Sequence, residues 1–238
     1  MNPYLAVTLA GAELWLLADK AVYYPAERSL LIADAHFGKA AAYRKLGQPV
    51  PHGTTQENLR RLDSLLNTYP CDHLIFLGDF LHAPESHAAG TLAALEQWRA
   101  ERSTLRITLI RGNHDKRAGD PPGYLDIDVV PEPLPLGPFA LQHEPDPHPE
   151  LHVLAGHVHP VYRLYGRGRQ SLRSRAQLGL CHRRRCGVAS GLTAHMACHD
   201  CLEQTRKRQP SKAGSWHRQI RRQALVADHP ARWGCPAR

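Results

Sequence analysis

Five short apolar runs in this chain each end at a cluster of Asp, Asn or His side chains. The runs lie at residues 30–33, 74–77, 107–110, 139–142 and 153–155. Between the first three, longer stretches carry apolar residues at helical spacing. Strands that alternate with helices predict an α/β fold with a sheet between helical layers. In open sheets of this kind, ligands bind beyond the carboxyl ends of the strands. We therefore expect the five clusters to share one rim of the sheet.

The helical stretches have recognisable limits. Residues 39–46 are rich in helix formers, and residues 87–102 place apolar side chains on one face. Thr54 and Thr55 are expected to cap a longer helix that runs through the leucines at 59, 62, 65 and 66. Near the N-terminus, the apolar runs 14–17 and 22–24 predict a hairpin.

The clusters supply metal ligands of one chemical kind. They are Asp34 with His36, then Gly78-Asp79, Gly112 to Asp115, His143, and Gly156 to His159. Carboxylate, amide and imidazole ligands without thiolate suit Mn²⁺, Fe²⁺ or Zn²⁺. A carboxylate can bridge two cations ~3.5–4 Å apart, and such pairs supply hydroxide and neutralise phosphate oxygens. Each motif alone is more often a turn or a cap, but five in this order predict a binuclear metal site.

The ordered series D-x-H, G-D, G-N-H-D/E, an isolated His and G-H-x-H resembles the signature of the calcineurin-like metallophosphoesterases. The resemblance covers residues 30–160. It implies a four-layer α/β/β/α sandwich with a binuclear metal site at the carboxyl-terminal rim of the strands. It also implies hydrolysis of phosphate esters.

The resemblance assigns a role to each matched residue. It implies that the first metal is bound by Asp34, His36 and His159, and that Asp79 bridges the two metals. The ligands of the second metal would be Asn113, His143 and His157. His114 would be the catalytic histidine, and Asp115 would orient it.

Further segments are similar to the bacterial ligase-associated DNA damage response endonuclease family. They are Gly38-Lys39-Ala40, residues 49–55, Gly78 to His82, and residues 137–141 before His143. This resemblance implies a manganese-dependent phosphodiesterase that cleaves DNA and works with an ATP-dependent DNA ligase and a helicase. Fe²⁺ or Zn²⁺ would also suit the ligand set. The motifs build the metal centre and not the substrate groove, so a phosphomonoesterase or a cyclic-nucleotide phosphodiesterase remains an alternative.

Three residues next to the motifs are candidates for substrate binding. Lys39 and Arg111 could meet phosphates, although exposed basic residues usually only solvate a face. His82 lies near Asp79 in the sequence and could touch substrate, although histidines at the start of a helix are common.

Charge and cysteine content divide the chain near Gly166. Of the net charge of +8, residues 1–166 carry −5 and residues 167–238 carry +13, and five of the six cysteines lie in the second part. We therefore expect a metallophosphoesterase domain over residues 1–168, which would lack its last strands if the reading frame is shifted. Residues 169–238 would form a basic, irregular tail rich in Cys and Arg.

Three hypotheses explain this tail. It could be a nucleic-acid-binding arm, which would make a non-catalytic nucleic-acid-binding protein the second alternative function. It could be a zinc module built from Cys181, Cys186, Cys198 and Cys201. We favour a shifted reading frame, because the resemblance stops after Arg169 and the closing apolar strands are lacking.

The chain has neither a signal-peptide pattern nor an apolar run of about 18 residues. We therefore expect a cytoplasmic protein with no membrane partner, and the sequence leaves its oligomeric state open.

Overall fold

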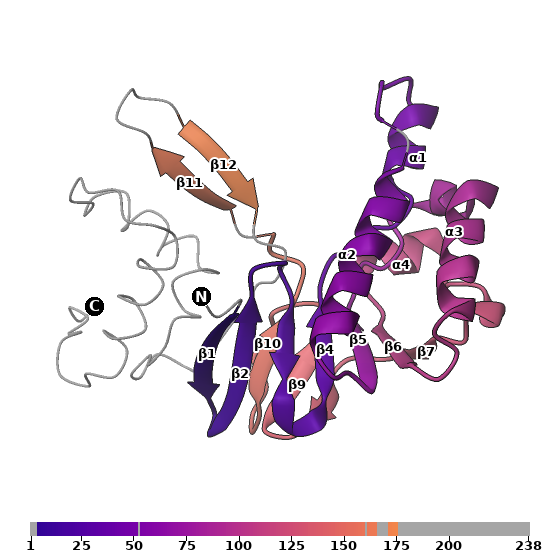
Figure 1. Ribbon diagram of the computed structural model, residues 1–238. Coiled ribbons are helices and arrows are strands. Elements are labelled where there is room, and N and C mark those ends of the chain that lie inside the picture. The colour runs from indigo at the N-terminus through magenta and orange to yellow at the C-terminus, as the bar shows by residue number, and fades with distance from the viewer. Residues whose placement is uncertain (1–3, 52, 160, 166–170, 176–238) are drawn as a thin grey trace.

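The computed structural model describes residues 4–51, 53–159, 161–165 and 171–175. A seven-stranded sheet has its strands in the order β1 to β7, and a three-stranded sheet has the order β10-β9-β8 (Figure 1). The strands of the large sheet are β1 (Tyr4–Leu9), β2 (Ala12–Leu17), β3 (Val22–Tyr24), β4 (Ser29–Ile32), β5 (His73–Leu77), β6 (Arg106–Ile110) and β7 (Asp128–Val130). Those of the small sheet are β8 (Leu134–Leu136), β9 (Phe139–Gln142) and β10 (His152–Ala155).

Both kinds of strand pairing occur in the large sheet. Strands β1 to β4 form an antiparallel meander, which confirms the predicted hairpin as β2 and β3. Strands β4 to β7 run parallel to one another, and β9 runs parallel to β10. The residues of β4 are all buried, and so are all but the first residue of β5 and of β6. This explains why these segments read as continuous apolar runs rather than alternating ones.

In the described ranges, four α-helices and three 3-10 helices accompany the sheets. The α-helices are α1 (Lys39–Lys45), α2 (Thr54–Thr68), α3 (Ala89–Ala100) and α4 (Asn113–Ala118). The 3-10 helices are η1 (Pro25–Glu27), η2 (Pro84–His87) and η3 (Gly123–Leu125). Residues 87–102, expected as one helix, are therefore split between the end of η2 and α3.

The predicted cap of α2 is wrong. Thr54 and Thr55 are the first residues of the helix, and the residue before it is Gly53, with φ of 88° and no side-chain hydrogen bond. Glycine adopts this left-handed conformation without the steric cost that a Cβ would bring. The chain therefore enters α2 through a backbone turn rather than through a hydroxyl cap.

Two apolar clusters hold the layers together. The first joins α2 and α3 to one face of the large sheet and includes Leu62, Trp98 and Phe76. The second lies between the two sheets and includes Ile75, Phe139 and Leu154. The fold is thus the expected α/β type, with three of the four layers described. A helix packed on the outer face of the small sheet does not occur within the described ranges.

The described part of the chain ends with an antiparallel pair, β11 (Val161–Tyr165) and β12 (Ser171–Arg175). This pair crosses the boundary predicted at residue 168, so part of the expected irregular tail is a strand. The division of the chain at that position stays a prediction. The cysteines of the proposed zinc module, the basic arm and the suspected frame shift lie outside the described residues. None of the helices in the described ranges is long and apolar enough to span a bilayer.

Candidate metal centre

The five polar clusters meet at one rim of the two sheets, as expected from their positions after parallel strands. The loop after β4 is hydrogen-bonded along its length to the loop after β5. The amides of Asp34, His36 and Phe37 donate to the carbonyls of Gly78, Asp79 and Phe80 at 3.2, 2.8 and 2.8 Å. These bonds fix the two loops against each other, so their side chains start from a rigid frame.

Five of the predicted ligands have left-handed backbone conformations. Asp34, His36, Asp79, His157 and His159 have φ between 42° and 69°. Such angles are uncommon for residues with a Cβ and are enriched at functional sites, where the surrounding structure over-determines them. Here the inter-loop hydrogen bonds supply that constraint. The left-handed turns redirect the chain immediately after each strand.

Two glycines leave the space that the predicted ligands occupy. Gly78 has φ of 79°, and a Cβ at this position would overlap the ring of His143. A Cβ at Gly112 would overlap the carboxylate of Asp79. The G-D and G-N-H-D motifs therefore need glycine for close packing of ligands, and at Gly78 also for its backbone angle.

The first group of ligands contains Asp34, His36, Asp79 and His159. One ligand atom from each lies within 4.8 Å of the others. The Nε2 atoms of His36 and His159 are 3.4 Å apart. His36 Nε2 lies 3.8 Å from Asp79 Oδ2, and His159 Nε2 lies 3.8 Å from Asp34 Oδ1. Two carboxylates and two imidazoles thus converge on a single point.

The second group contains Asn113, His143 and His157. Asn113 Oδ1 lies 2.8 Å from His143 Nε2 and 3.1 Å from His157 Nδ1, and these two nitrogens are 3.1 Å apart. His143 Nε2 is also 3.4 Å from Asp79 Oδ1. The two groups have the membership expected from the sequence, and their binding of metals stays a prediction.

Asp79 lies between the two groups. Its Oδ2 faces His36 in the first group, and its Oδ1 faces His143 in the second. Its side chain is 2% exposed, and Oδ1 accepts a hydrogen bond from the His114 amide at 2.9 Å. A carboxylate with one oxygen toward each group has the arrangement of a bridging ligand.

The protonation pattern of the histidines fits cation binding. Leu77 O, which can only accept, lies 3.0 Å from Nδ1 of the buried His143. Nδ1 therefore carries the proton, and in the neutral ring Nε2 presents its lone pair to the second group. Burial, together with nearby Lys39 and neighbouring histidines, lowers the pKa of His36 to about 2. The imidazole of His36 is therefore neutral at neutral pH.

Asp34 is held by the loop after β10. Its two carboxylate oxygens accept the His157 amide at 3.1 and 3.2 Å. Burial raises the pKa of Asp34 to about 6, although the His157 amide and neighbouring imidazoles partly offset this effect. A buried carboxylate that resists ionisation without a cation is consistent with a metal ligand. The donor set, the tautomers and this burial all fit two divalent cations.

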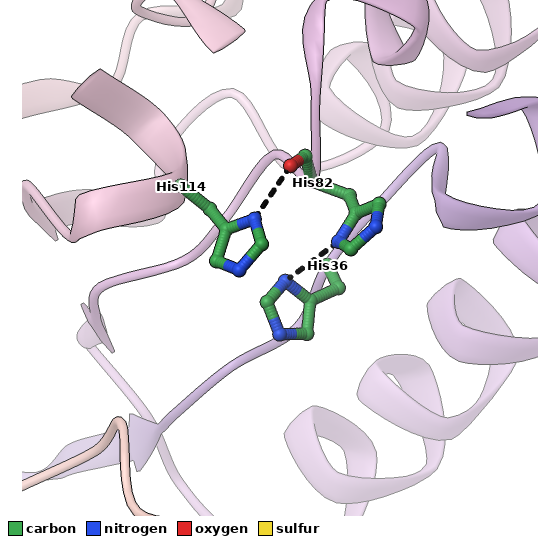
Figure 2. Close-up of side chains that lie close together, drawn as sticks. All are labelled: His36, His82 and His114. Atoms are coloured by element: carbon green, nitrogen blue, oxygen red, sulfur yellow. Dashed lines mark hydrogen bonds between the residues drawn. The ribbon is translucent and has the colours of Figure 1, made fainter. Parts of the chain in front are cut away.

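The rings of His36 from the first group, His82 and His114 lie next to one another (Figure 2). His36 Nδ1 and His82 Nδ1 are 3.4 Å apart, so His82 contacts the nitrogen of His36 that faces away from the ligands. His114 Nδ1 lies 2.7 Å from the His82 carbonyl oxygen. Because that oxygen only accepts, Nδ1 of His114 is the protonated nitrogen. His114 Nε2 then lies toward Asp79, 4.0 Å from Oδ2.

The structure gives Asp115 a different contact from the predicted one. Its carboxylate is fully buried and accepts the amides of Gly112 and Leu81, each at 2.9 Å. It makes no hydrogen bond to the imidazole of His114 within the described residues. Instead it fixes Leu81, whose neighbour His82 supplies the carbonyl that orients His114. Burial raises the pKa of Asp115, and the backbone hydrogen bonds oppose this rise.

The three predicted substrate-binding residues have different surroundings. Lys39 is half-buried at the start of α1, near His36 and His82. His82 is half-buried among the histidines. Arg111 instead forms a two-point ion pair with Asp120, at 2.8 and 2.6 Å. Its guanidinium is therefore already engaged, which does not favour the predicted contact with phosphate.

One residue beside the site was missed by sequence reasoning. Glu132 Oε2 accepts the amides of His143 at 2.7 Å and Glu144 at 3.3 Å. It thereby fixes the backbone of a predicted ligand. Glu132 belongs to a Pro-rich connection and has no motif around it, so only the three-dimensional structure reveals the contact.

Comparisons with known proteins agree with this geometry. Residues 28–177 match the family model described as calcineurin-like phosphoesterase. The crystal structure of the nuclease MPE from Pseudomonas putida is similar to this chain, with 47% sequence identity and a TM-score of 0.65. That match covers 81% of this chain and 94% of the Pseudomonas chain. The comparison with curated proteins gave no match.

Proposed function

Because this chain belongs to the calcineurin-like phosphoesterase family, we propose that it is a metal-dependent nuclease that hydrolyses phosphodiester bonds in DNA. The observation that carries the proposal is the pair of ligand groups on either side of the Asp79 carboxylate. The 47% identity to a nuclease supports nucleic acid as the substrate. We assign the first metal to Asp34, His36 and His159, and the second to Asn113, His143 and His157.

When bound, two divalent cations would supply a hydroxide at neutral pH and would neutralise charge on the phosphate oxygens. Side chains of the protein would then orient the metal ligands and transfer a proton to the leaving oxygen. His114 has its protonated Nδ1 fixed by the His82 carbonyl, so Nε2 is the atom that takes up a proton from solvent and, from the imidazolium form, donates it to the leaving oxygen. His82 Nδ1 contacts His36 and stabilises the ring orientation of that ligand. Asp115 holds the loop after β5 against the loop after β6 through the amides of Leu81 and Gly112.

The finer assignments are also proposals. Manganese is the metal that the family resemblance favours, with Fe²⁺ or Zn²⁺ as alternatives that the same ligands would accept. A role in DNA repair beside an ATP-dependent ligase and a helicase, and a cytoplasmic location, stay predictions. Lys39 and His82 are the candidates for contact with the substrate phosphate.

The test compares three substrates in the presence of Mn²⁺: circular single-stranded DNA, bis(4-nitrophenyl) phosphate and 4-nitrophenyl phosphate. A nuclease is expected to cut the circle and the diester and to act poorly on the monoester. Asp79→Asn and His114→Ala should each lower the rate about 100-fold or more, and Asp79→Asn should also reduce bound metal. Faster hydrolysis of the monoester would instead indicate a phosphomonoesterase. DNA binding by the wild type without any hydrolysis would indicate the non-catalytic alternative.

A further inference from the structure

A cavity of about 240 Å³ adjoins the candidate metal centre. One wall is the loop 35–38, which carries His36, and the opposite wall is the start of α2 with Thr55 and Asn58. Tyr43 of α1 and Val50 also line the cavity. His36 belongs both to this wall and to the first ligand group, so the cavity borders that group.

Of the residues in the two ligand groups, only His36 lines the cavity. Neither His114 nor any member of the second ligand group lines it. His114 is the proposed proton donor to the leaving oxygen, so the leaving group lies on its side. The cavity is therefore placed for the other substituent of the phosphodiester, the one that stays on phosphorus.

The lining has the character of a small-molecule site. Phe37, Ala40 and Val50 supply apolar surface, and Tyr43 supplies an aromatic ring. Thr55 and Asn58 are half-buried, and their side chains form no hydrogen bond with any residue in the described ranges. An amide group offers a donor and an acceptor together, which matches the edge of a nucleobase. Aromatic rings provide faces on which bases stack.

Size and charge favour a single nucleoside. The cavity volume is below the roughly 300–1,000 Å³ of sites that enclose a whole drug-sized ligand. It corresponds to about eight water molecules at ~30 Å³ each, which suits one base with part of its sugar. Lys39 lies in the same wall as His36, so a cation stands where the cavity meets the metal centre. A phosphodiester attached to the bound nucleoside would lie next to that charge.

We infer that this cavity binds the nucleoside on the non-leaving side of the scissile phosphate, with Tyr43 and Asn58 as residues that determine substrate preference. The inference rests on the proposed nuclease function and adds a subsite to it. Binding energy gained there is expected to raise kcat/KM for substrates that carry a nucleoside at this position.

The experiment uses esters with the same leaving group. Methyl 4-nitrophenyl phosphate and the 5′ and 3′ 4-nitrophenyl phosphates of thymidine all release nitrophenolate, and only the thymidine esters can fill the cavity. In the wild-type protein with Mn²⁺, kcat/KM for at least one thymidine ester should exceed that for the methyl ester by about tenfold or more. Val50→Trp, which fills the cavity, should bring this ratio close to one. Asn58→Ala should lower it about threefold or more.

Leu46→Trp is the matched control, because it adds the same bulk at a side chain that is 74% exposed and does not line the cavity. Its ratio should equal that of the wild type. A loss of folded protein lowers kcat/KM for both esters by the same factor, so it leaves their ratio unchanged. If Val50→Trp does not fold, Asn58→Ala provides the test. Equal kcat/KM for methyl and thymidine esters in the wild type would overturn the inference, and so would an unchanged ratio in both cavity variants. Absence of hydrolysis of every ester and of DNA would instead overturn the proposed nuclease function on which it rests.

Discussion

Replacing Asp115 by alanine should destabilise the protein strongly without removing any proposed metal ligand. The carboxylate is fully buried and accepts the amides of Gly112 and Leu81, each at 2.9 Å. Hydrogen bonds to a charged group contribute about 1.5–3 kcal/mol each. Two such bonds would give about 3–6 kcal/mol. The cost of burying the charge, visible in the raised pKa, offsets part of this sum. We therefore expect a loss of about 3–5 kcal/mol in the free energy of unfolding.

For a chain of this size, that loss corresponds to a fall in Tm of about 6–20 °C, which differential scanning calorimetry measures directly. Asp115→Asn keeps one acceptor and should lose less. The control is Asp120→Ala, which removes an exposed carboxylate paired with Arg111 and should change Tm little, since solvent screens such pairs. The opposite outcome would be an Asp115→Ala variant that melts like the wild type while its activity falls as far as that of His114→Ala. That result would mean that Asp115 acts on the imidazole rather than on the backbone.

Three further predictions follow from contacts around the site. Glu132→Gln weakens the acceptor of the His143 amide and should lower Mn²⁺ affinity, measured by calorimetry, about three- to tenfold. The control Glu150→Gln, at an exposed side chain, should leave the affinity unchanged. Equal Mn²⁺ affinities of Glu132→Gln and the wild type would contradict the positioning role of Glu132. Arg111→Gln should change KM for DNA less than twofold, because Asp120 already engages the Arg111 guanidinium. A rise in KM above fivefold would instead support the phosphate contact predicted from the sequence. Burial raises the pKa of Asp34 to about 6, and a metal needs the ionised carboxylate, so bound protons compete with Mn²⁺ as pH falls through 6. Mn²⁺ affinity should therefore be at least about tenfold lower at pH 5 than at pH 7, and equal affinities at the two pH values would contradict the burial argument.

The core strands and the ligand clusters were predictable because each one leaves a local pattern. A strand buried on both faces reads as an apolar run, and parallel strands bring the residues that follow them to one rim. The strand β1 and the short strands β7 and β8 were not predicted. The half-exposed β1 and the Pro-rich connection that contains β8 give weak patterns.

The features missed around the site depend on contacts between distant segments. The hydrogen bonds from the His143 amide to Glu132 and from the Leu81 amide to Asp115 join residues that no short-range rule relates. The cap of α2 was predicted from the hydroxyls of Thr54 and Thr55, but Gly53 enters the helix through a left-handed turn. Residue type alone favoured the threonines as the helix cap. The path of the backbone instead places Gly53 at the cap position.

We propose that two cations bind on either side of the Asp79 carboxylate. Anomalous diffraction at the manganese absorption edge, from crystals of the protein grown with Mn²⁺, tests it most directly. We expect two peaks of comparable height about 3.5–4 Å apart. One should be surrounded by Asp34, His36 and His159, and the other by Asn113, His143 and His157. A single peak, or a peak held by His36, His82 and His114 in place of this pair, would contradict it.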